Sequence, residues 1–281
     1  MTSDLERSIQ RKAVNAPVAS SPIDPQLLLL AYRSGIFPMA DARDDPEIFW
    51  VEPRKRAILP LDGFHCSRSL AKVLKSGRFE VTCNTAFAAV IDACAAPRRE
   101  TSETWISGRI RASYIALHEL DHAHSIEVWF GTGSERQLVG GLYGVGFDRV
   151  FCGESMFSRM TDSSKVALAW LVAALRHAGC ELLDCQFMTE HLASLGAIEI
   201  TQSRYLKLLR AAQSGPAGDA EAAGVGLADG LAEGWGEGAA DGVDAGAGLP
   251  AGFAALLAAA ASAGVSSSPG NFIAQSLTHT S

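Results

Sequence analysis

The order of strand-like and helix-like segments between residues 124 and 187 constrains the fold most. Residues 124–130, 137–147 and 149–157 are strand-like and are separated by short polar turns, which predicts consecutive paired strands. A long, mostly apolar helix is expected over 163–178, and one more strand over 181–187. Strands, a helix and then a further strand predict an α+β fold with a mainly antiparallel sheet.

Further helices are expected around this sheet, and two of them begin at recognisable caps. Residues 24–35 open with Asp24 as an N-cap and Pro25 at the first helical position. A second helix is capped by Ser67 and precedes a strand that starts at Phe79. Other helices are predicted over 85–97, 110–123 and 189–197, and a loop that lines a site over 36–53.

The charge and the glycines of the chain are unevenly distributed. Residues 214–281 hold seven acidic residues and no Lys or Arg, so residues 1–213 contain 24 acidic and 24 basic residues. The same C-terminal segment holds 14 of the 27 glycines and few large apolar residues, too few to offset the entropy of ordering. We therefore expect a flexible N-terminus over 1–21, a folded body, and a low-complexity, disordered tail over 214–281.

Several classes of protein are disfavoured by what the sequence lacks. The N-terminal residues have no apolar run of the secretory kind, and no stretch approaches the roughly 18–20 apolar residues that cross a bilayer. The six cysteines are scattered without a C-x-x-C pair, which indicates free thiols and neither a disulfide framework nor a zinc site. We expect a soluble, cytoplasmic protein with no membrane partner, no metal and no cofactor.

The last expected strand, "ELLDCQF", carries two polar residues among apolar ones. Asp184 and Gln186 are two positions apart, so in a regular strand their side chains share one face. A hydrogen-bonded structural pair at a sheet end is one interpretation. The other is a carboxylate that orients or polarises an amide, which then contacts a substrate. The residues alone leave the two interpretations about even.

Other candidate residues stand near this strand in the expected fold. Glu154 is placed at the end of a strand, between a glycine and an apolar "SMF", which favours a site. Leu168, Leu171 and Leu175 form one apolar stripe on the long helix, which is more typical of a core than of a pocket wall. Trp105, near a loop, is equally compatible with burial and with stacking on a base.

Two clusters of ionisable residues have both a structural and a functional interpretation. Arg68, Lys72 and Lys75 form one basic helix face that suits phosphates but is equally typical of a solvated surface. His122 and His124 share a strand face, yet no further ligands follow at metal-binding spacing, which favours a structural role.

Motifs for phosphate-containing cofactors are missing from the expected strand–helix connections. An acetyltransferase would suit the α+β layout, but it needs a glycine-containing turn that leads into a helix and cradles a diphosphate. Here the long helix begins with "TDSSK", so coenzyme A is not expected. A Walker loop, a dinucleotide fingerprint and G-x-S-x-G are also missing.

Ten segments of the chain occur in the order seen in leucyl/phenylalanyl-tRNA–protein transferases, a family that residues 22–210 resemble. They are "GIFP", "FWVEPRKRAILP", "HCSRSL", "TWISGRI", "LHELDHAHSIEVW", "LVGGLYGV", "FCGESMFSR", "SSKVAL", "LLDCQF" and "HLASLGA". The resemblance implies a small N-terminal domain over 22–65 and an acetyltransferase-like (GNAT-like) catalytic domain over 66–213. It also implies transfer of Leu or Phe, and less well Met, from aminoacyl-tRNA to proteins with N-terminal Arg or Lys, which are thereby marked for N-end rule degradation.

The resemblance also implies roles for individual residues. The family's catalytic residues match Asp184, Gln186 and Glu154. Its amino-acid pocket matches Phe151, Met156, Leu168, Leu171, Leu175 and Leu183. Its tRNA-binding residues match Trp105, near the 3′-terminal adenosine, and Arg68, Lys72 and Lys75, at the acceptor stem.

Two other functions are compatible with this kind of chain. One is a tRNA-dependent aminoacyl transferase that acts on a cell-wall precursor amine, whose motifs do not match. The other is a non-catalytic tRNA- or peptide-binding module, which the intact Asp184, Gln186 and Glu154 argue against. The final segment "FIAQSLTHTS" resembles the end of some family members and suggests a short docking segment after inserted low-complexity sequence.

Overall fold

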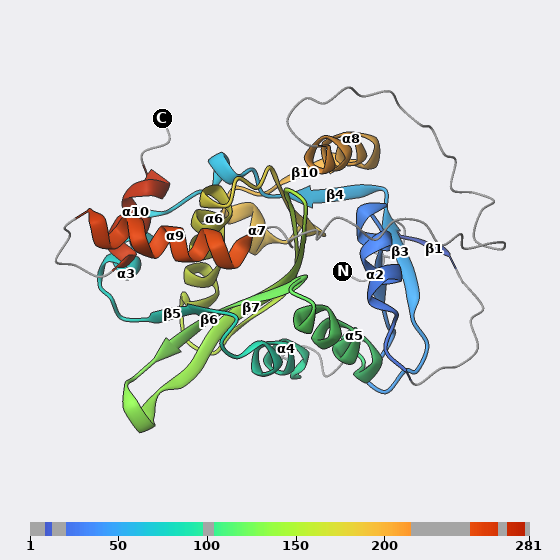
Figure 1. Ribbon diagram of the computed structural model, residues 1–281, viewed down its shortest axis with the longest axis horizontal. Helices are drawn as coiled ribbons and strands as arrows, with labels where there is room; N and C mark the ends of the chain where they lie inside the picture. The colour runs from blue at the N-terminus through green and yellow to red at the C-terminus, as the bar shows by residue number, and fades with distance from the viewer. Residues whose placement is uncertain (1–8, 13–20, 98–103, 215–247, 264–268, 279–281) are drawn as a thin grey trace.

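The computed structural model describes residues 9–12, 21–97, 104–214, 248–263 and 269–278, and its largest element is a seven-stranded sheet (Figure 1). The strand order is β10-β4-β9-β8-β7-β6-β5. β8 and β9 run parallel, and the other neighbours run antiparallel. The expected α+β fold with a mainly antiparallel sheet is confirmed. The strands are β4 (Lys55–Ile58), β5 (Glu80–Cys83), β6 (Ala123–Phe130), β7 (Gln137–Phe147), β8 (Val150–Ser158), β9 (Leu182–Gln186) and β10 (Ile198–Thr201).

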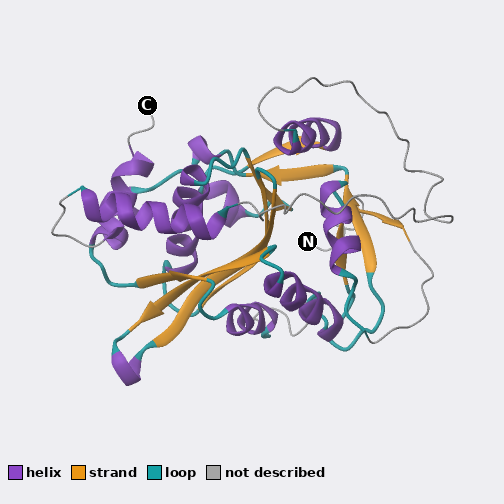
Figure 2. Cartoon of the chain, in the orientation of Figure 1, coloured by secondary structure: helices purple, strands orange, loops and turns teal. Residues whose placement is uncertain are grey.

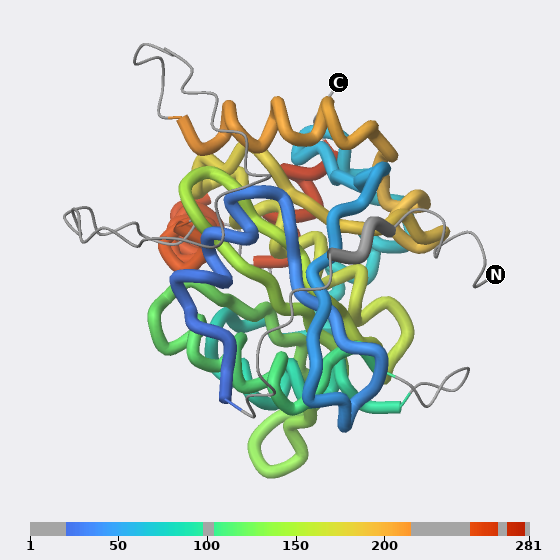
Figure 3. The backbone as a smooth tube through the Cα atoms, turned by 90° about the vertical axis from the view of Figure 1, so that its right-hand side faces the viewer, coloured from blue at the N-terminus to red at the C-terminus, as the bar shows by residue number. Residues whose placement is uncertain are grey.

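Helices cover both faces of this sheet and bury two separate apolar clusters (Figure 2). The first face carries α3 (Arg68–Lys75), α6 (Ser163–His177), α7 (Glu190–Ser194), α9 (Leu249–Ser262) and α10 (Pro269–Thr278). The second carries α2 (Pro25–Arg33), α4 (Phe87–Ala95), α5 (Gly108–Glu119) and α8 (Gln202–Gln213). The side view in Figure 3 has the blue α2 segment and its following strands in front of the sheet.

The caps expected at the two early helices are confirmed. The Asp24 carboxylate accepts hydrogen bonds from the backbone N–H groups of Gln26 and Leu27 at the start of α2. Ser67 Oγ accepts from the N–H of Leu70 at the start of α3. These bonds satisfy N–H groups that the first helical turn leaves without partners, so both helices begin at the expected residues.

The expectation that residues 36–53 form a loop is wrong in part. β2 (Phe37–Met39) and β3 (Phe49–Pro53) pair within it, and β1 (Ile9–Lys12) joins β3, although residues 9–12 were expected to belong to a flexible N-terminus. Strands this short, with prolines inside them, carry too few alternating positions to be told from a loop by sequence pattern. β4 lies in the seven-stranded sheet, although the sequence division at residue 65 assigned it to the N-terminal segment.

Part of the expected disordered tail is helical, which corrects that expectation for two segments. α9 packs along α6, and α10 packs on α3 and α6. A Cβ at Gly252 would collide with the carbonyl oxygen of Ala174, and one at Gly270 with that of Leu74, so glycine permits this close approach. The sequence count of large apolar residues missed that small residues can pack closely against a helix. Residues 215–247, 264–268 and 279–281 lie outside the described part of the chain.

Within the described ranges, no helix combines the length and the apolar character needed to cross a membrane.

Candidate active site

A cavity of about 380 Å³ opens between β8, β9, α6 and the start of α7. Its apolar wall is formed by Leu142, Met156, Leu168, Leu171, Leu183 and Leu192. Polar groups reach it from Glu154, Ser155, Gln186, Thr189 and His191. An apolar wall with a few convergent polar groups is typical of a small-molecule site, and the volume lies in the usual range.

Strand irregularities place the polar groups at this cavity. The register of β7 and β8 shifts between Tyr143 and Gly144, so Glu154 is an extra residue in a β-bulge. The sequence had placed Glu154 at a strand end, but it lies inside β8. A second register shift, where β4 meets β9, leaves Cys185 as the extra residue between Asp184 and Gln186. Bulges re-aim side chains, and both lie beside the cavity.

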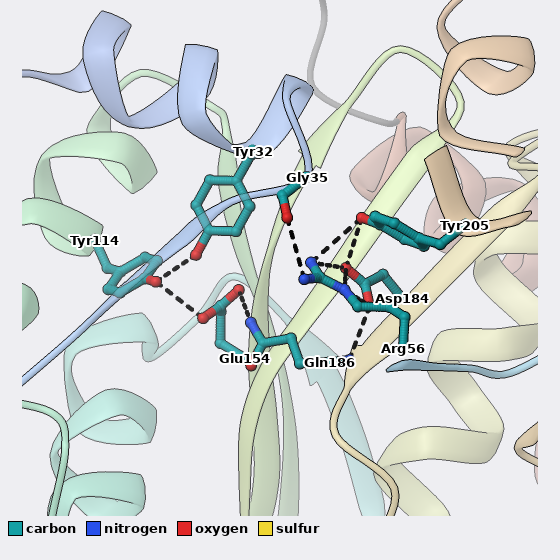
Figure 4. Close-up of polar contacts among 8 residues, drawn as sticks. All are labelled: Tyr32, Gly35, Arg56, Tyr114, Glu154, Asp184, Gln186 and Tyr205. Carbon is teal, nitrogen blue, oxygen red and sulfur yellow. Dashed lines mark hydrogen bonds and ion pairs between the residues drawn. The ribbon is translucent and has the colours of Figure 1, made fainter. Parts of the chain in front are cut away.

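Glu154 and Gln186 meet directly, as Figure 4 shows. The amide Nε2 of Gln186 donates to Glu154 Oε1 at 2.8 Å. The hydroxyl of Tyr114 donates to Glu154 Oε2 at 2.9 Å, and Tyr32 in turn contacts the Tyr114 hydroxyl. Among the described residues, no hydrogen bond to the carboxamide oxygen of Gln186 is formed, so this oxygen is available to accept one.

Asp184 has different partners and does not line the cavity. Its carboxylate, which is fully buried, forms an ion pair with Arg56 at 2.6 Å and accepts from the Tyr205 hydroxyl at 2.9 Å. It also accepts from the backbone N–H of Gln186 at 2.8 Å. Asp184 therefore contacts the main chain of Gln186, whereas the side-chain amide of Gln186 bonds to Glu154. The expectation that two side chains share one face fails because the bulge at Cys185 breaks the strand alternation.

The two environments affect protonation differently. Burial raises the pKa of Glu154 to about 7, and hydrogen bonding from Tyr32, Tyr114 and Gln186 opposes that rise. Burial, together with the Glu154 charge, raises the pKa of Tyr114 well above its usual value, so this hydroxyl remains a donor. Glu154 is therefore a carboxyl group that titrates near neutral pH while it contacts an amide in a cavity.

Four of the six predicted pocket residues line the cavity: Met156, Leu168, Leu171 and Leu183. Phe151 and Leu175 are fully buried and are not among its lining residues. Leu175 lies one turn beyond Leu171, and about 10 Å along α6 from Leu168, which carries it past the cavity. Phe151 lies against Gly144, where an added Cβ would meet its ring. Trp105, which was predicted to lie near the terminal adenosine of the tRNA, also lines this cavity.

The predicted basic face lies apart from this cavity. Arg68, Lys72 and Lys75 are exposed and line a surface groove of about 390 Å³, together with Thr278 at the end of α10. None of the three forms an ion pair with a described residue. The groove is therefore open to an anionic partner.

The histidine pair has the surroundings of a structural element. Burial lowers the pKa of His124 to about 4, and its Nδ1 lies 3.0 Å from Asn84 Nδ2. In the described part of the chain, no group of three His, Cys, Asp or Glu side chains is arranged to hold a metal ion.

Sequence reasoning missed Arg56, Tyr205, Tyr32 and Tyr114 as parts of the site. Arg56 follows two other basic residues, Arg54 and Lys55, in a short strand near a proline. Its sequence context is therefore that of a cation on the surface. The tyrosines lie on three helices far apart in sequence. The sequence signal that could have identified these tyrosines is their place on the apolar face of each helix. That signal predicts burial but does not identify a hydrogen-bond partner.

Comparisons with known proteins identify the family of this chain. The model of the family "Leucyl/phenylalanyl-tRNA protein transferase" matches residues 58–210, and that of its N-terminal domain matches residues 21–54. A protein of Novosphingobium aromaticivorans named leucyl/phenylalanyl-tRNA–protein transferase is 68% identical over 259 residues, which cover 92% of this chain and 97% of the relative.

A second relative with the same name, from Zymomonas mobilis, is 58% identical over 192 residues, which cover 68% of this chain and 70% of that protein. One solved structure, that of L-PGS from Bacillus licheniformis, aligns at 14% identity with a TM-score of 0.32, over 62% of this chain and 56% of that one, and bears on neither fold nor function. The matches of the family model and of the two relatives, over most of the chain, show that this protein belongs to the leucyl/phenylalanyl-tRNA–protein transferase family.

Proposed function

We propose that the protein transfers Leu or Phe, and less well Met, from aminoacyl-tRNA to the N-terminal amine of proteins that begin with Arg or Lys, and so marks them for N-end rule degradation. The observation that carries this proposal is the cavity in which an apolar wall meets the Glu154–Gln186 pair. The 68% identity to a relative named for this reaction supports the same conclusion.

The reaction needs an amine held next to an ester, without a covalent nucleophile from the enzyme. The α-amine has a pKa near 7.7–8.0 and is mostly protonated at neutral pH. In our proposal the Gln186 carboxamide oxygen accepts a hydrogen bond from this amine, and Glu154 takes the proton that it loses. The pKa of Glu154, about 7, is close enough to that of the amine for proton transfer in either direction.

The bond changes then balance without a cofactor. The amine nitrogen forms a bond to the ester carbonyl carbon, and the ester carbon–oxygen bond breaks. The tRNA ribose oxygen leaves and receives, by way of Glu154, the one proton that the neutral amine releases as it becomes an amide. The extra proton of the ammonium form passes to solvent before the attack. Glu154 and Gln186 act by holding the amine in line with the carbonyl and by moving one proton.

The remaining predicted residues have roles around this centre. We place the Leu or Phe side chain against Met156, Leu168, Leu171 and Leu183, which supply apolar surface. Phe151 and Leu175 support this wall from the core. Trp105, at the cavity, stacks on the terminal adenosine, and the groove with Arg68, Lys72 and Lys75 receives the acceptor-stem phosphates.

We also propose the finer features of the fold that the family implies. Six strands of the main sheet, β5 to β10, with the parallel β8–β9 pair next to the cavity, support an acetyltransferase-like domain over 66–213 that uses tRNA in place of coenzyme A. A small N-terminal domain over 22–65 completes it. The substrates named above place the reaction in the cytoplasm.

A transfer assay tests the proposed function. The protein is incubated with Leu-tRNA or Phe-tRNA and peptides that differ only in an N-terminal Arg, Lys or Ala. We expect transfer to Arg and Lys peptides only. Equal transfer to the Ala peptide, or transfer only to a cell-wall precursor amine, would exclude the proposal. Binding of the aminoacyl-tRNA without any transfer would identify a non-catalytic binding module.

A matched pair of variants tests the pocket. Leu171 lines the cavity, whereas Leu175, on the same helix, does not. Leu171→Ala is expected to change the ratio of Phe to Leu transfer, by roughly 10-fold for the apolar contact that is lost. Leu175→Ala is expected to lower the free energy of unfolding by about 2–5 kcal/mol and to leave that ratio unchanged. The same change of ratio in both variants would refute this placement of the side chain.

A further inference from the structure

Gln186 has an unusual backbone conformation at the point where it meets the cavity. Five non-glycine residues of the described chain have positive φ, and four of them are Asn or Asp, which tolerate it. Gln186 is the fifth, with φ of 61°. The left-handed region costs a residue of this type roughly 1–2 kcal/mol, so something in the surroundings must hold it there.

The Asp184 carboxylate supplies the contact that holds this conformation. Asp184 Oδ1 accepts from the N–H of Gln186 at 2.8 Å, across the bulged Cys185. A carboxylate that bonds to the main chain two residues ahead stabilises a turn-like backbone. With the backbone turned in this way, the Gln186 side chain points to Glu154 (Figure 4).

Arg56 in turn fixes the position of the carboxylate. Its Nε and Nη2 bond to both oxygens of Asp184 at 2.6–3.0 Å. The central carbon of the guanidinium lies over the rings of Phe37 and Tyr205, 4.8 and 4.5 Å from their centroids. Its Nη1 donates to the carbonyl oxygen of Gly35 at 3.2 Å. The Arg56 side chain is buried and held on every edge, so it cannot change conformation without breaking several contacts.

Tyr205, on α8, completes the enclosure. Its hydroxyl donates to Asp184 Oδ2 at 2.9 Å, while its ring covers one face of the Arg56 guanidinium. The lone pairs of Asp184 thus bond to an arginine, a tyrosine and the main chain of Gln186. The carboxylate is 0% exposed and does not reach the cavity, which leaves it no contact with a substrate.

We propose that Arg56 and Tyr205 are positioning residues for the transfer reaction, which act through the Asp184 carboxylate to hold Gln186 in its left-handed conformation and its amide on Glu154. Arg56 acts by fixing the carboxylate, and Tyr205 by holding both the carboxylate and the guanidinium. The kinetic part of this inference rests on the proposed function.

A double-variant cycle distinguishes positioning from direct chemistry by Asp184. Arg56→Met and Asp184→Asn each leave one buried partner unpaired, and we expect each to lower kcat by about 100-fold, as for a misplaced reacting group. The double variant Arg56→Met/Asp184→Asn removes the charge pair but keeps an oxygen that accepts from the Gln186 N–H. It is expected to recover to within about 10-fold of wild type. A double variant no more active than the single variants would overturn the proposal.

Two further kinetic readouts separate positioning from a general loss of structure. The KM for aminoacyl-tRNA and the pH at which kcat reaches half its maximum are expected to stay at wild-type values in Tyr205→Phe, while kcat falls by roughly 3–10-fold. A shift of that pH midpoint would mean that Tyr205 acts on the proton transfer itself and not by positioning, and would overturn the inference. Lys55→Met, next to Arg56 but in an exposed ion pair with Glu199, is the matched control and is expected to behave as wild type.

A structural readout tests the inference even if the wild-type protein transfers no amino acid. In a crystal structure of Asp184→Ala, we expect Gln186 to leave the left-handed region and its Nε2 to move out of hydrogen-bond range of Glu154. If that variant does not fold, Tyr205→Phe is examined in the same way for a longer contact between Gln186 Nε2 and Glu154 Oε1. An unchanged Gln186 in the variant examined would overturn the proposal, independently of the transfer assay.

Discussion

Asp184 and Glu154 are buried carboxylates on the neighbouring strands β9 and β8, yet their surroundings differ in one decisive respect. Asp184 bonds to a cation, Arg56, and is closed off from the cavity. Among the described residues, the hydrogen-bond donors to Glu154, which include Tyr114 and Gln186, are neutral, and Glu154 lines the cavity. Burial is common to both, so it does not by itself decide what a carboxylate does.

The partner's charge explains the difference. A buried ion pair keeps both members charged, and removing one member leaves a charge that the interior cannot stabilise. Neutral donors stabilise a carboxylate less, so burial shifts the equilibrium of Glu154 toward the protonated form. The Asp184 side therefore holds structure in place, and the Glu154 side can exchange a proton. The predictions below test this division.

The largest effect is expected from Asp184→Ala, which leaves the buried Arg56 charge without its carboxylate partner. We expect a loss of about 3–5 kcal/mol in the free energy of unfolding, measured by urea denaturation. The Arg56→Met/Asp184→Asn variant, which removes the charge pair together, is expected to lose clearly less. If both lose the same amount, the charge of Asp184 is not what stabilises this region.

Glu154→Gln is expected to separate activity from stability in the opposite way. The amide cannot take the amine proton, so kcat should fall by about 10²–10⁴-fold. Because Glu154 has no cationic partner among the described residues, the variant should unfold at the wild-type urea concentration or above it at pH 8. Retained kcat in this variant would remove Glu154 from the reaction.

The pH dependence of stability should carry the signature of Glu154. Its pKa is about 7 in the folded protein and 4.5 as the ordinary value, so between these values the folded state binds more protons. The contribution is fully present below about pH 4.5 and is lost as pH rises past about 7, a decrease of up to about 3 kcal/mol. The measurement is the difference in unfolding free energy between wild type and Glu154→Gln from pH 5 to pH 8. A pH-independent difference would contradict the raised pKa.

The smallest effect is expected from Tyr114→Phe, which removes one hydrogen bond to Glu154 Oε2. That bond favours the charged carboxylate, so without it the pKa of Glu154 should rise further, by about one unit. The pH at which kcat reaches half its maximum should then move upward, with a stability loss of about 1 kcal/mol. Tyr205→Phe, which removes a hydrogen bond to Asp184, is the comparison and should leave this pH unchanged.

Much of the fold could be predicted from local signals. The caps at Asp24 and Ser67, the long apolar helix and the strands of the main sheet follow from periodicity and from turn residues, which act within a few positions. The strands β2 and β3 and the helices α9 and α10 could not be predicted in this way. Their formation depends on pairing and close packing with segments that are distant in the sequence. Composition and short sequence patterns carry no information about such contacts.

Part of the candidate site could be predicted from the sequence, and the rest depends on the tertiary structure. The sequence by itself determined which residues are polar in an apolar setting, namely Asp184, Gln186 and Glu154, and which leucines share the α6 face. Only the tertiary structure decided their partners, because two bulges turn Glu154 and Gln186 toward each other and because Arg56, Tyr114 and Tyr205 arrive from other elements. A hydrogen bond depends on where two groups lie in space, and that position is set by the packing of the whole sheet and its helices.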